Sequence, residues 1–164
     1  MTEAARKERN RQRLTECFPK FAARLEAVIK AMEDQGFRQR IQDAHRTIAD
    51  QRKAFDGGFS RVLFGFHNVT GKEDKPEALA VDLLDDDRPL SPNREYLIRL
   101  AATAQAQGLQ TGIFFGLPQA LRRGLSEAIA SLDFNPAIKI GFDPTHVEVK
   151  GISIAEAKAG KRPG

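Results

Sequence analysis

Apolar residues recur at three- and four-residue intervals across positions 14–32 of this 164-residue chain. That period places their side chains on one face of an amphipathic α-helix, and Gly36 is a typical residue for its C-terminal end. The residues of this stripe are Leu14, Phe18, Phe21, Leu25, Val28, Ile29 and Met32. A helix of this kind has to cover its apolar face, either in the core of a layered domain or as a seam between subunits.

The remainder of the chain alternates short apolar runs with further helical patterns. Strands are expected at residues 37–44, 77–86 and 109–117, and in a closing pair, "AIKIGF" (137–142) and "HVEV" (146–149). Helices are expected at residues 48–55, 93–107, 118–132 and 153–160, the first of them capped by Thr47 and stopped by Gly57 and Gly58. Helices first, with strands spread between them, indicate an α+β domain with a small, mainly antiparallel sheet packed with helices.

Composition is ordinary for a globular protein, with 41% hydrophobic and 29% charged residues. The length suits one domain with a real core. We expect a flexible basic N-terminus at residues 1–13, a single domain at residues 14–155 and a flexible tail at residues 156–164. The formal charge of +4 suggests an anionic partner without identifying it. The oligomeric state does not follow from the sequence.

The single cysteine excludes an intrachain disulfide and a cluster of thiolate metal ligands. Cys17 lies among apolar residues and is expected to be a buried structural thiol. The first thirty residues contain no apolar segment of the signal-peptide type, and no apolar run reaches the roughly 18 residues of a membrane span. We therefore expect cytoplasmic synthesis without a signal peptide and no membrane span.

Two of the three histidines, His67 and His146, are candidates for a metal site together with Asp82. A catalytic zinc site usually takes three protein ligands. Asp82 interrupts an apolar strand, where a carboxylate is costly unless it is paired or bound to a cation. Asp143 lies three residues before His146 and could act as a general base. The alternatives are histidines that merely pack in the core and a β-turn at residues 143–145.

Several segments, in order, resemble the zinc D-alanyl-D-alanine carboxypeptidase family, which includes VanX- and VanY-like enzymes and phage endolysin L-alanyl-D-glutamate peptidases. The family shows S-x-H-x-x-G-x-A-x-D, then a distant D/E-x-x-H-x-E, with Y-R-(S/T), a glutamine and G-x-S upstream. The matching segments here are "HRT" (45–47), Gln51, "GFS" (58–60), "GFH" (65–67), "ALAVD" (78–82) and "DPTHVE" (143–148). The resemblance implies a hedgehog-type peptidase fold and a Zn²⁺ cofactor.

The same resemblance implies a role for each matched polar residue. His67, Asp82 and His146 are then the zinc ligands. Asp143 resembles the catalytic base, and Arg46 resembles the arginine that stabilises the tetrahedral oxyanion. Glu148 is expected to orient a metal ligand from behind, and Gln51 and Ser60 are expected to contribute to substrate binding.

The chain departs from the family pattern at three points. Gly65 stands in place of the family serine and Ala78 in place of a glycine. Positions 67 and 82 are fifteen residues apart where the family typically has seven. An insertion of "TGKEDKPE" (70–77) would explain the difference, and such a loop could lie over the cleft and alter specificity.

The resemblance predicts a zinc-dependent peptidase that hydrolyses peptidoglycan stem peptides, as an endopeptidase or a D,D-carboxypeptidase. Such an enzyme could be a phage or prophage lysin that acts on the cell wall after release or delivery. The expected partner is a peptidoglycan peptide, with no nucleic acid. The alternative is a metal-free binding module of the same fold that uses its basic surface for nucleic acid or a protein partner.

Overall fold

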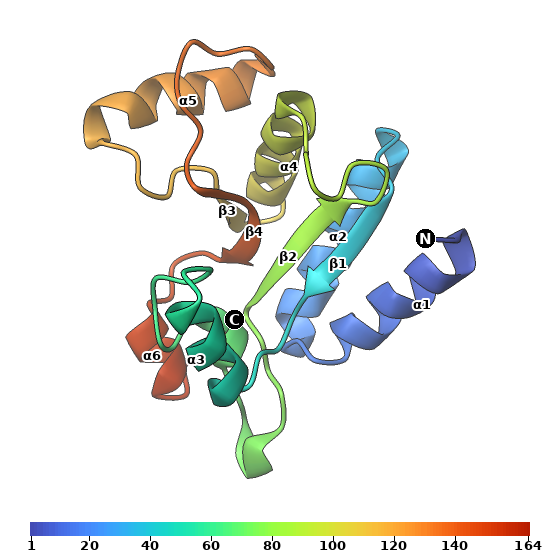
Figure 1. The fold of residues 1–164 in the computed structure, drawn as a ribbon, viewed down its shortest axis with the longest axis vertical. Helices are drawn as coiled ribbons and strands as arrows, with labels where there is room; N and C mark the ends of the chain where they lie inside the picture. The colour runs from blue at the N-terminus through green and yellow to red at the C-terminus, as the bar shows by residue number, and fades with distance from the viewer.

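The computed structural model describes residues 1–164 as an α+β domain, which confirms the predicted fold class (Figure 1). Its four strands form an antiparallel sheet in the order β1-β2-β4-β3. The strands are β1 (Gln39–Asp43), β2 (Ala80–Asp85), β3 (Leu109–Gly112) and β4 (Asp143–Val149). The α-helices are α1 (Glu3–Leu14), α2 (Pro19–Asp34), α3 (Ile48–Asp56), α4 (Arg94–Ala106), α5 (Gln119–Ser131) and α6 (Ile154–Lys158).

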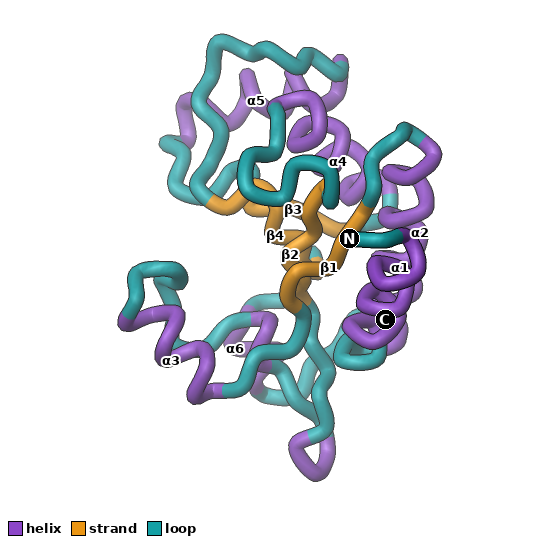
Figure 2. The backbone as a smooth tube through the Cα atoms, turned by 45° about the vertical axis from the view of Figure 1, so that its right-hand side comes forward, coloured by secondary structure: helices purple, strands orange, loops and turns teal.

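Helices α2 and α4 cover one face of the sheet. Helices α3 and α6 lie near the end of the sheet at which β1 and β4 finish (Figures 1 and 2). Most of the apolar stripe of α2 is buried in the core with the inward residues of β2 and β4, and Ile29 is partly buried against it. Because the stripe is covered inside the domain, it is not available as a seam between subunits. The buried hydroxyl of Tyr96 on α4 donates to the carbonyl of Leu83, 2.8 Å away.

The predicted first helix is interrupted, because the chain turns between α1 and α2. Pro19 occupies the first turn of α2, where its missing N–H costs nothing. The stripe of residues 14–32 is therefore shared between the end of α1 and the whole of α2.

The expectation of a flexible N-terminus at residues 1–13 is wrong, because α1 covers the edge strand β1. Arg6 is only 2% exposed and donates to the Gln39 carbonyl. The Asn10 amide donates to the same carbonyl at 2.9 Å and accepts from the Ile41 N–H at 2.8 Å. An edge strand exposes unpaired backbone groups, and the polar residues of α1 satisfy those of β1.

The C-terminal residues 156–164, expected to be a flexible tail, are also tied to the domain. They begin within α6, whose capping box joins Ser153 and Glu156. Arg162 then pairs with Glu77 at 2.6 Å and donates to the Thr70 carbonyl at 2.8 Å.

Two other expectations about the strands need correction, and the first is the strand expected at residues 109–117, because β3 ends at Gly112. Residues 137–142 do not form a strand, although Gly141 and Phe142 donate backbone hydrogen bonds to Ile113 and Phe115. A β-bulge at Thr111/Gly112 ends the regular ladder there, so these segments meet as irregular backbone.

None of the helices has the length and hydrophobicity that a membrane span requires.

The predicted insertion at residues 70–77 is a self-contained hairpin that protrudes at the lower end of Figure 1. Thr70 and Pro76 form an antiparallel bridge, and the Glu77 N–H donates to the Val69 carbonyl at 3.0 Å. Since Val69 and Glu77 are neighbours, the hairpin leaves the path from His67 to β2 undisturbed. It packs against the C-terminal segment and not over the cleft, so the expected position over the cleft is wrong.

Candidate metal centre and its cleft

The two central strands bring Asp82 and His146 together on the face that α2 and α4 leave open. Asp82 of β2 is the register partner of His146 of β4, and Ala80 is the partner of Glu148. Residues two apart in a strand point to the same face, so His146 and Glu148 lie in one row. Ala80 has a small side chain and leaves room for the Glu148 carboxylate beside it.

His67 comes from outside the sheet, on the 3-10 turn Phe66–Asn68. Asn68 holds this turn in place, because its side chain accepts from the Gly65 N–H and donates to the Arg46 carbonyl, both at 2.8 Å. The Arg46 N–H in turn donates to the His67 carbonyl at 2.8 Å. The turn is therefore fastened to the segment that carries Arg46.

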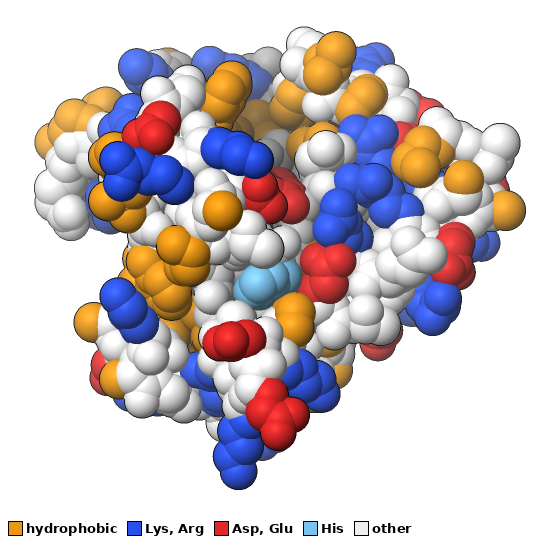
Figure 3. All heavy atoms as spheres, turned by 60° about the horizontal axis from the view of Figure 1, so that its bottom comes forward, with side chains coloured by type: hydrophobic (Ala, Val, Ile, Leu, Met, Phe, Trp, Pro, Cys, Tyr) orange, Lys and Arg blue, Asp and Glu red, His pale blue; other side chains and the backbone are white.

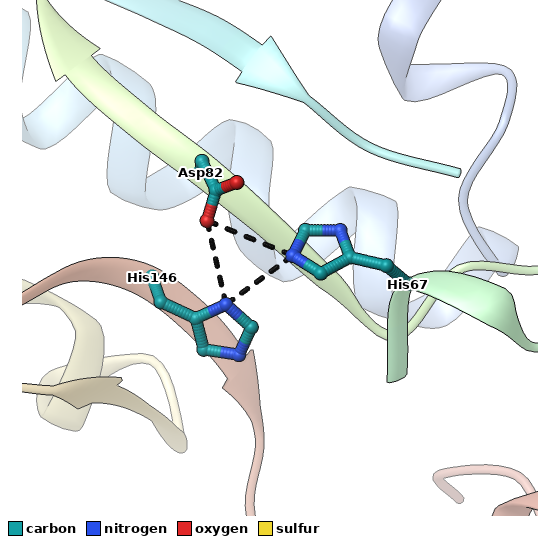
Figure 4. A group of neighbouring side chains, drawn as sticks. All are labelled: His67, Asp82 and His146. Carbon is teal, nitrogen blue, oxygen red and sulfur yellow. Dashed lines mark hydrogen bonds and ion pairs between the residues drawn. The ribbon is translucent and has the colours of Figure 1, made fainter. Parts of the chain in front are cut away.

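His67, Asp82 and His146 point one ligand atom each toward a common centre (Figure 4). His67 Nε2 lies 3.3 Å from His146 Nδ1 and 3.6 Å from Asp82 Oδ1. His146 Nδ1 lies 3.4 Å from Asp82 Oδ1. Ligands of a tetrahedral zinc ion at bond lengths of about 2.1 Å are about 3.4 Å apart, so this spacing fits zinc.

The outer nitrogen of each histidine is held by a hydrogen-bond acceptor. His67 Nδ1 donates to the Ala44 carbonyl at 2.6 Å, and His146 Nε2 donates to Glu148 Oε2 at 2.8 Å. Glu148 Oε1 accepts from the Gln110 amide, also at 2.8 Å. When both imidazoles are neutral and carry their proton on these outer nitrogens, they and the Asp82 carboxylate turn lone pairs toward each other, an arrangement that a cation relieves.

The charges of this group are strongly coupled in the metal-free protein. Burial would lower the pKa of His146, but hydrogen bonds to Asp82 and Glu148 outweigh it and raise that pKa to about 10. Burial would raise the pKa of Asp82, but hydrogen bonds from His146 and His67 hold it well below its usual range. The pocket thus favours a positive charge between its carboxylates.

Asp143 begins β4 at the edge of the same group. Its Oδ2 lies 3.9 Å from His146 Nδ1, and its side chain is half-buried. Burial raises the pKa of Asp143 above its ordinary value. The residue belongs to a strand and not to the β-turn considered as an alternative for residues 143–145.

Arg46 is oriented by a second network. Its Nη2 lies 2.6 Å from Asp43 Oδ2 and 3.8 Å from Asp82 Oδ2, and its Nη1 donates to Gln51 Oε1 at 3.0 Å. The Gln51 amide donates to Ser60 Oγ at 2.8 Å. Gln51 is 2% exposed and uses both ends of its amide within the chain.

All eight predicted site residues line one cleft of about 660 Å³. They are Arg46, Gln51, Ser60, His67, Asp82, Asp143, His146 and Glu148. Figure 3 shows one face of the molecule, on which a histidine side chain reaches the surface among acidic and basic side chains. His45, the third histidine, does not line the cleft, and its Nε2 is buried without a hydrogen-bond partner.

Sequence reasoning missed two residues that hold the site together, Asp43 and Gln110. Gln110 is the register partner of Glu148, and Asp43 is the partner of Asp82. A weak signal existed for each, since Gln110 interrupts an apolar run and Asp43 precedes Arg46 by three residues. Their cross-strand partners could not be read without the register.

The basic residues near the N-terminus are largely used inside the chain. Arg6 is buried, Arg9 donates to the carbonyls of Ile41 and Gln42, and Arg11 pairs with Glu8. The binding-module alternative gains no support from this segment.

No family model and no curated protein match this chain. A solved structure with a similar fold is the L-Ala D-Glu endopeptidase ChiX of Serratia marcescens. The similarity covers 87% of this chain and 86% of that chain, with a TM-score of 0.54 and 14% sequence identity. The two chains share a fold. At this level of identity the similarity shows only that the two folds are alike. The chemistry of this chain has to be argued from its own site residues.

Proposed function

We propose that the chain is a zinc-dependent peptidase that hydrolyses peptidoglycan stem peptides. The observation that carries the proposal is the convergence of three ligand atoms, from His67, Asp82 and His146, with the outer nitrogen of each histidine hydrogen-bonded. Imidazole and carboxylate ligands in threes, with room for a fourth, are typical of catalytic zinc sites. The similarity to an endopeptidase fold supports the same reading.

Zinc held by His67, Asp82 and His146 would supply Lewis-acid polarisation of the scissile carbonyl and a lowered pKa for the attacking water. Asp143 takes one proton from the water as the water oxygen bonds to the carbonyl carbon. Asp143 then gives that proton to the leaving nitrogen as the C–N bond breaks, which yields a carboxylic acid and an amine. The proton left on the acid passes to the amine, so the final products are a carboxylate and an ammonium group. Burial raises the pKa of Asp143, and a raised pKa helps this carboxyl group both to accept a proton and to donate it.

Arg46 is proposed to stabilise the negative charge that develops on the carbonyl oxygen. Its guanidinium lines the cleft and is fixed by Asp43 and Gln51, so it needs no reorganisation as the charge develops. Gln51 and Ser60 are proposed to contribute to substrate binding indirectly, because their hydrogen bonds hold the wall of the cleft in place. Glu148 fixes the ring of His146.

Of the two bond specificities, we propose the endopeptidase, which is the activity named for the protein of similar fold, an L-Ala D-Glu endopeptidase. Cleavage between L-Ala and D-Glu separates the peptide from the glycan-proximal residue, whereas a D,D-carboxypeptidase releases only D-Ala. Mass spectrometry of the soluble products distinguishes the two.

The test combines metal content with hydrolysis. Purified full-length protein should contain about one zinc per chain by elemental analysis and should release peptides from purified peptidoglycan. A chelator should abolish release, and added Zn²⁺ should restore it. His67→Ala should lose both metal and activity, while His45→Asn, a change of a histidine outside the cleft, should keep both.

Hydrolysis by zinc-free protein would overturn the metal mechanism. Absence of hydrolysis by zinc-loaded protein on peptidoglycan would overturn the peptidase itself. Tight, salt-sensitive DNA binding by the metal-free protein would favour the binding module instead.

A further inference from the structure

The cleft contains a second arginine, Arg61, whose guanidinium has no partner of opposite charge. Arg61 is exposed and lines the cleft, and it makes no ion pair or side-chain hydrogen bond. Its one specific contact is the ring of Phe142, with the guanidinium carbon 3.7 Å from the ring centroid. An arginine stacked on an aromatic ring is preorganised and keeps its N–H groups free for a bidentate acceptor.

A single buried side chain, Gln51, hydrogen-bonds the residues on both sides of Arg61. The Gln51 amide donates to Ser60 Oγ at 2.8 Å and to the Val62 carbonyl at 2.7 Å. Phe59 and Ser60 also donate backbone hydrogen bonds to the Ala54 carbonyl at the end of α3. The arginine therefore projects from a fixed segment.

The aromatic platform under Arg61 is fixed as well. Phe142 donates its backbone N–H to the Phe115 carbonyl at 3.0 Å. Gly116 has a φ of +78°, and a Cβ there would lie 2.9 Å from the Phe142 ring, so glycine leaves room for the ring. A Cβ on Gly141 would meet Ile113 and Phe115 backbone atoms at 2.5–2.6 Å, so glycine also permits this close approach.

The platform connects Arg61 to the metal group through a chain of rings. The centroid of Phe115 lies 5.8 Å from that of Phe142 and 5.8 Å from that of His146. Phe142 also immediately precedes Asp143. Along this path Arg61 lies within about five extended peptide residues of the metal ligand His146.

The cleft's other cation, Arg46, is already paired with Asp43, so a carboxylate on a ligand would find its free partner in Arg61. We propose that Arg61 is a specificity-determining residue that binds a substrate carboxylate a few residues from the scissile bond. This inference rests on the proposed peptidase function and adds the substrate class, an acidic peptide. Stem peptides offer two such groups, the α-carboxylate of a γ-linked D-glutamate and the terminal carboxylate of D-alanine.

The experiment compares three forms of the peptide L-Ala-γ-D-Glu-L-Lys-D-Ala. One keeps only the D-glutamate α-carboxylate, one keeps only the terminal carboxylate, and one has both groups amidated. Calorimetry measures their binding to chelator-treated full-length protein, which cannot hydrolyse them by the proposed mechanism. Hydrolysis is measured separately with zinc-loaded protein. The variants are Arg61→Gln, Arg61→Lys and, as an equal charge change outside the cleft, Arg123→Gln on α5, whose side chain is 90% exposed.

We expect one carboxylate form to bind the wild type about 10–100-fold more tightly than the doubly amidated form. Arg61→Gln should abolish that preference, Arg61→Lys should retain only part of it, and Arg123→Gln should leave it unchanged. The preferred form identifies which carboxylate is recognised.

Equal or absent binding of all three forms by the wild type, or a preference that survives in Arg61→Gln, overturns the inference. Hydrolysis without a carboxylate preference would leave the peptidase standing and remove the role of Arg61. An Arg61-dependent preference without hydrolysis by zinc-loaded protein would keep the role of Arg61 in carboxylate binding and remove the peptidase function.

Discussion

Asp82 and His146 face each other directly across the central strand pair, with Asp82 Oδ1 3.4 Å from His146 Nδ1. They are 64 positions apart in the sequence, and the antiparallel register of β2 and β4 makes them neighbours. The same register carries Glu148 to the position behind His146. One ladder thus positions two metal ligands and the group that orients one of them.

Glu148→Gln should weaken metal binding without unfolding the domain. The amide is nearly isosteric but loses the negative charge that accepts from His146 Nε2. Loss of such an outer partner typically costs about 10–100-fold in metal affinity. Competition with a chromophoric chelator measures this, with Glu127→Gln on α5 as the exposed control. An unchanged affinity would mean that Glu148 does not support the ligand.

Asp143→Asn should lower kcat by about 10²–10⁴-fold while leaving zinc content unchanged. The reason is that the amide cannot take the proton from water, whereas the three ligands are intact. Metal analysis and steady-state kinetics on the same preparation separate the two effects. Activity within a few-fold of the wild type would remove Asp143 from the role of base, and loss of zinc would make it a ligand.

The fold class and the cleft residues could be predicted because they depend on local patterns and short motifs. The α2 stripe and the cap at Thr47 follow from spacing and side-chain chemistry, and both are present. What failed depends on distant contacts. The polar residues of α1 look solvated in sequence, yet Arg6 and Asn10 are buried because β1 needs partners for its edge.

The network around the candidate site shows the same limit. Gln110 became a partner of Glu148 through the β3–β4 register, which no periodicity in the sequence reveals. Asp85 and Asp86 look solvated in the sequence, since they stand at the end of an apolar strand, but both are buried. Asp86 pairs with Arg40 at 2.9 Å, and Arg40 is contributed by the neighbouring strand β1.

Shortening the hairpin at residues 70–77 should leave the metal group intact. Replacing residues 71–75 by Asn-Gly removes the hydrogen bond from the Gly71 N–H to the Lys75 carbonyl. It keeps the bond from the Glu77 N–H to the Val69 carbonyl and the contacts of Glu77 and the Thr70 carbonyl with Arg162. We expect the free energy of unfolding to change by less than about 1 kcal/mol, since loop length has a weak entropic cost.

Zinc content and thermal unfolding measure the effect of this replacement. The contrasting variant is Asn68→Ala, which removes two hydrogen bonds that hold the turn of His67 and should weaken zinc binding. A shortened hairpin that loses zinc would show that the loop supports the site.

Cys17 should make the domain less stable at alkaline pH. Burial raises the pKa of this thiol from its ordinary value of 9.0 to about 12. Between these two values the unfolded chain releases a proton that the folded chain retains, so the free energy of unfolding falls as pH rises from about 9 to about 12. Below pH 9 both states keep the proton, and the contribution is constant.

Urea unfolding of the wild type and Cys17→Ala across pH 8–11 tests this, because both proteins retain the buried Tyr96 and every other titrating group. The alanine variant should start less stable, through lost packing, but decline less steeply above pH 9. Consistent with the raised pKa, a thiol reagent should modify the native wild type at pH 8 only at the rate of unfolding. Parallel declines of the two proteins, together with rapid labelling of the native state, would show that Cys17 ionises freely in the folded chain.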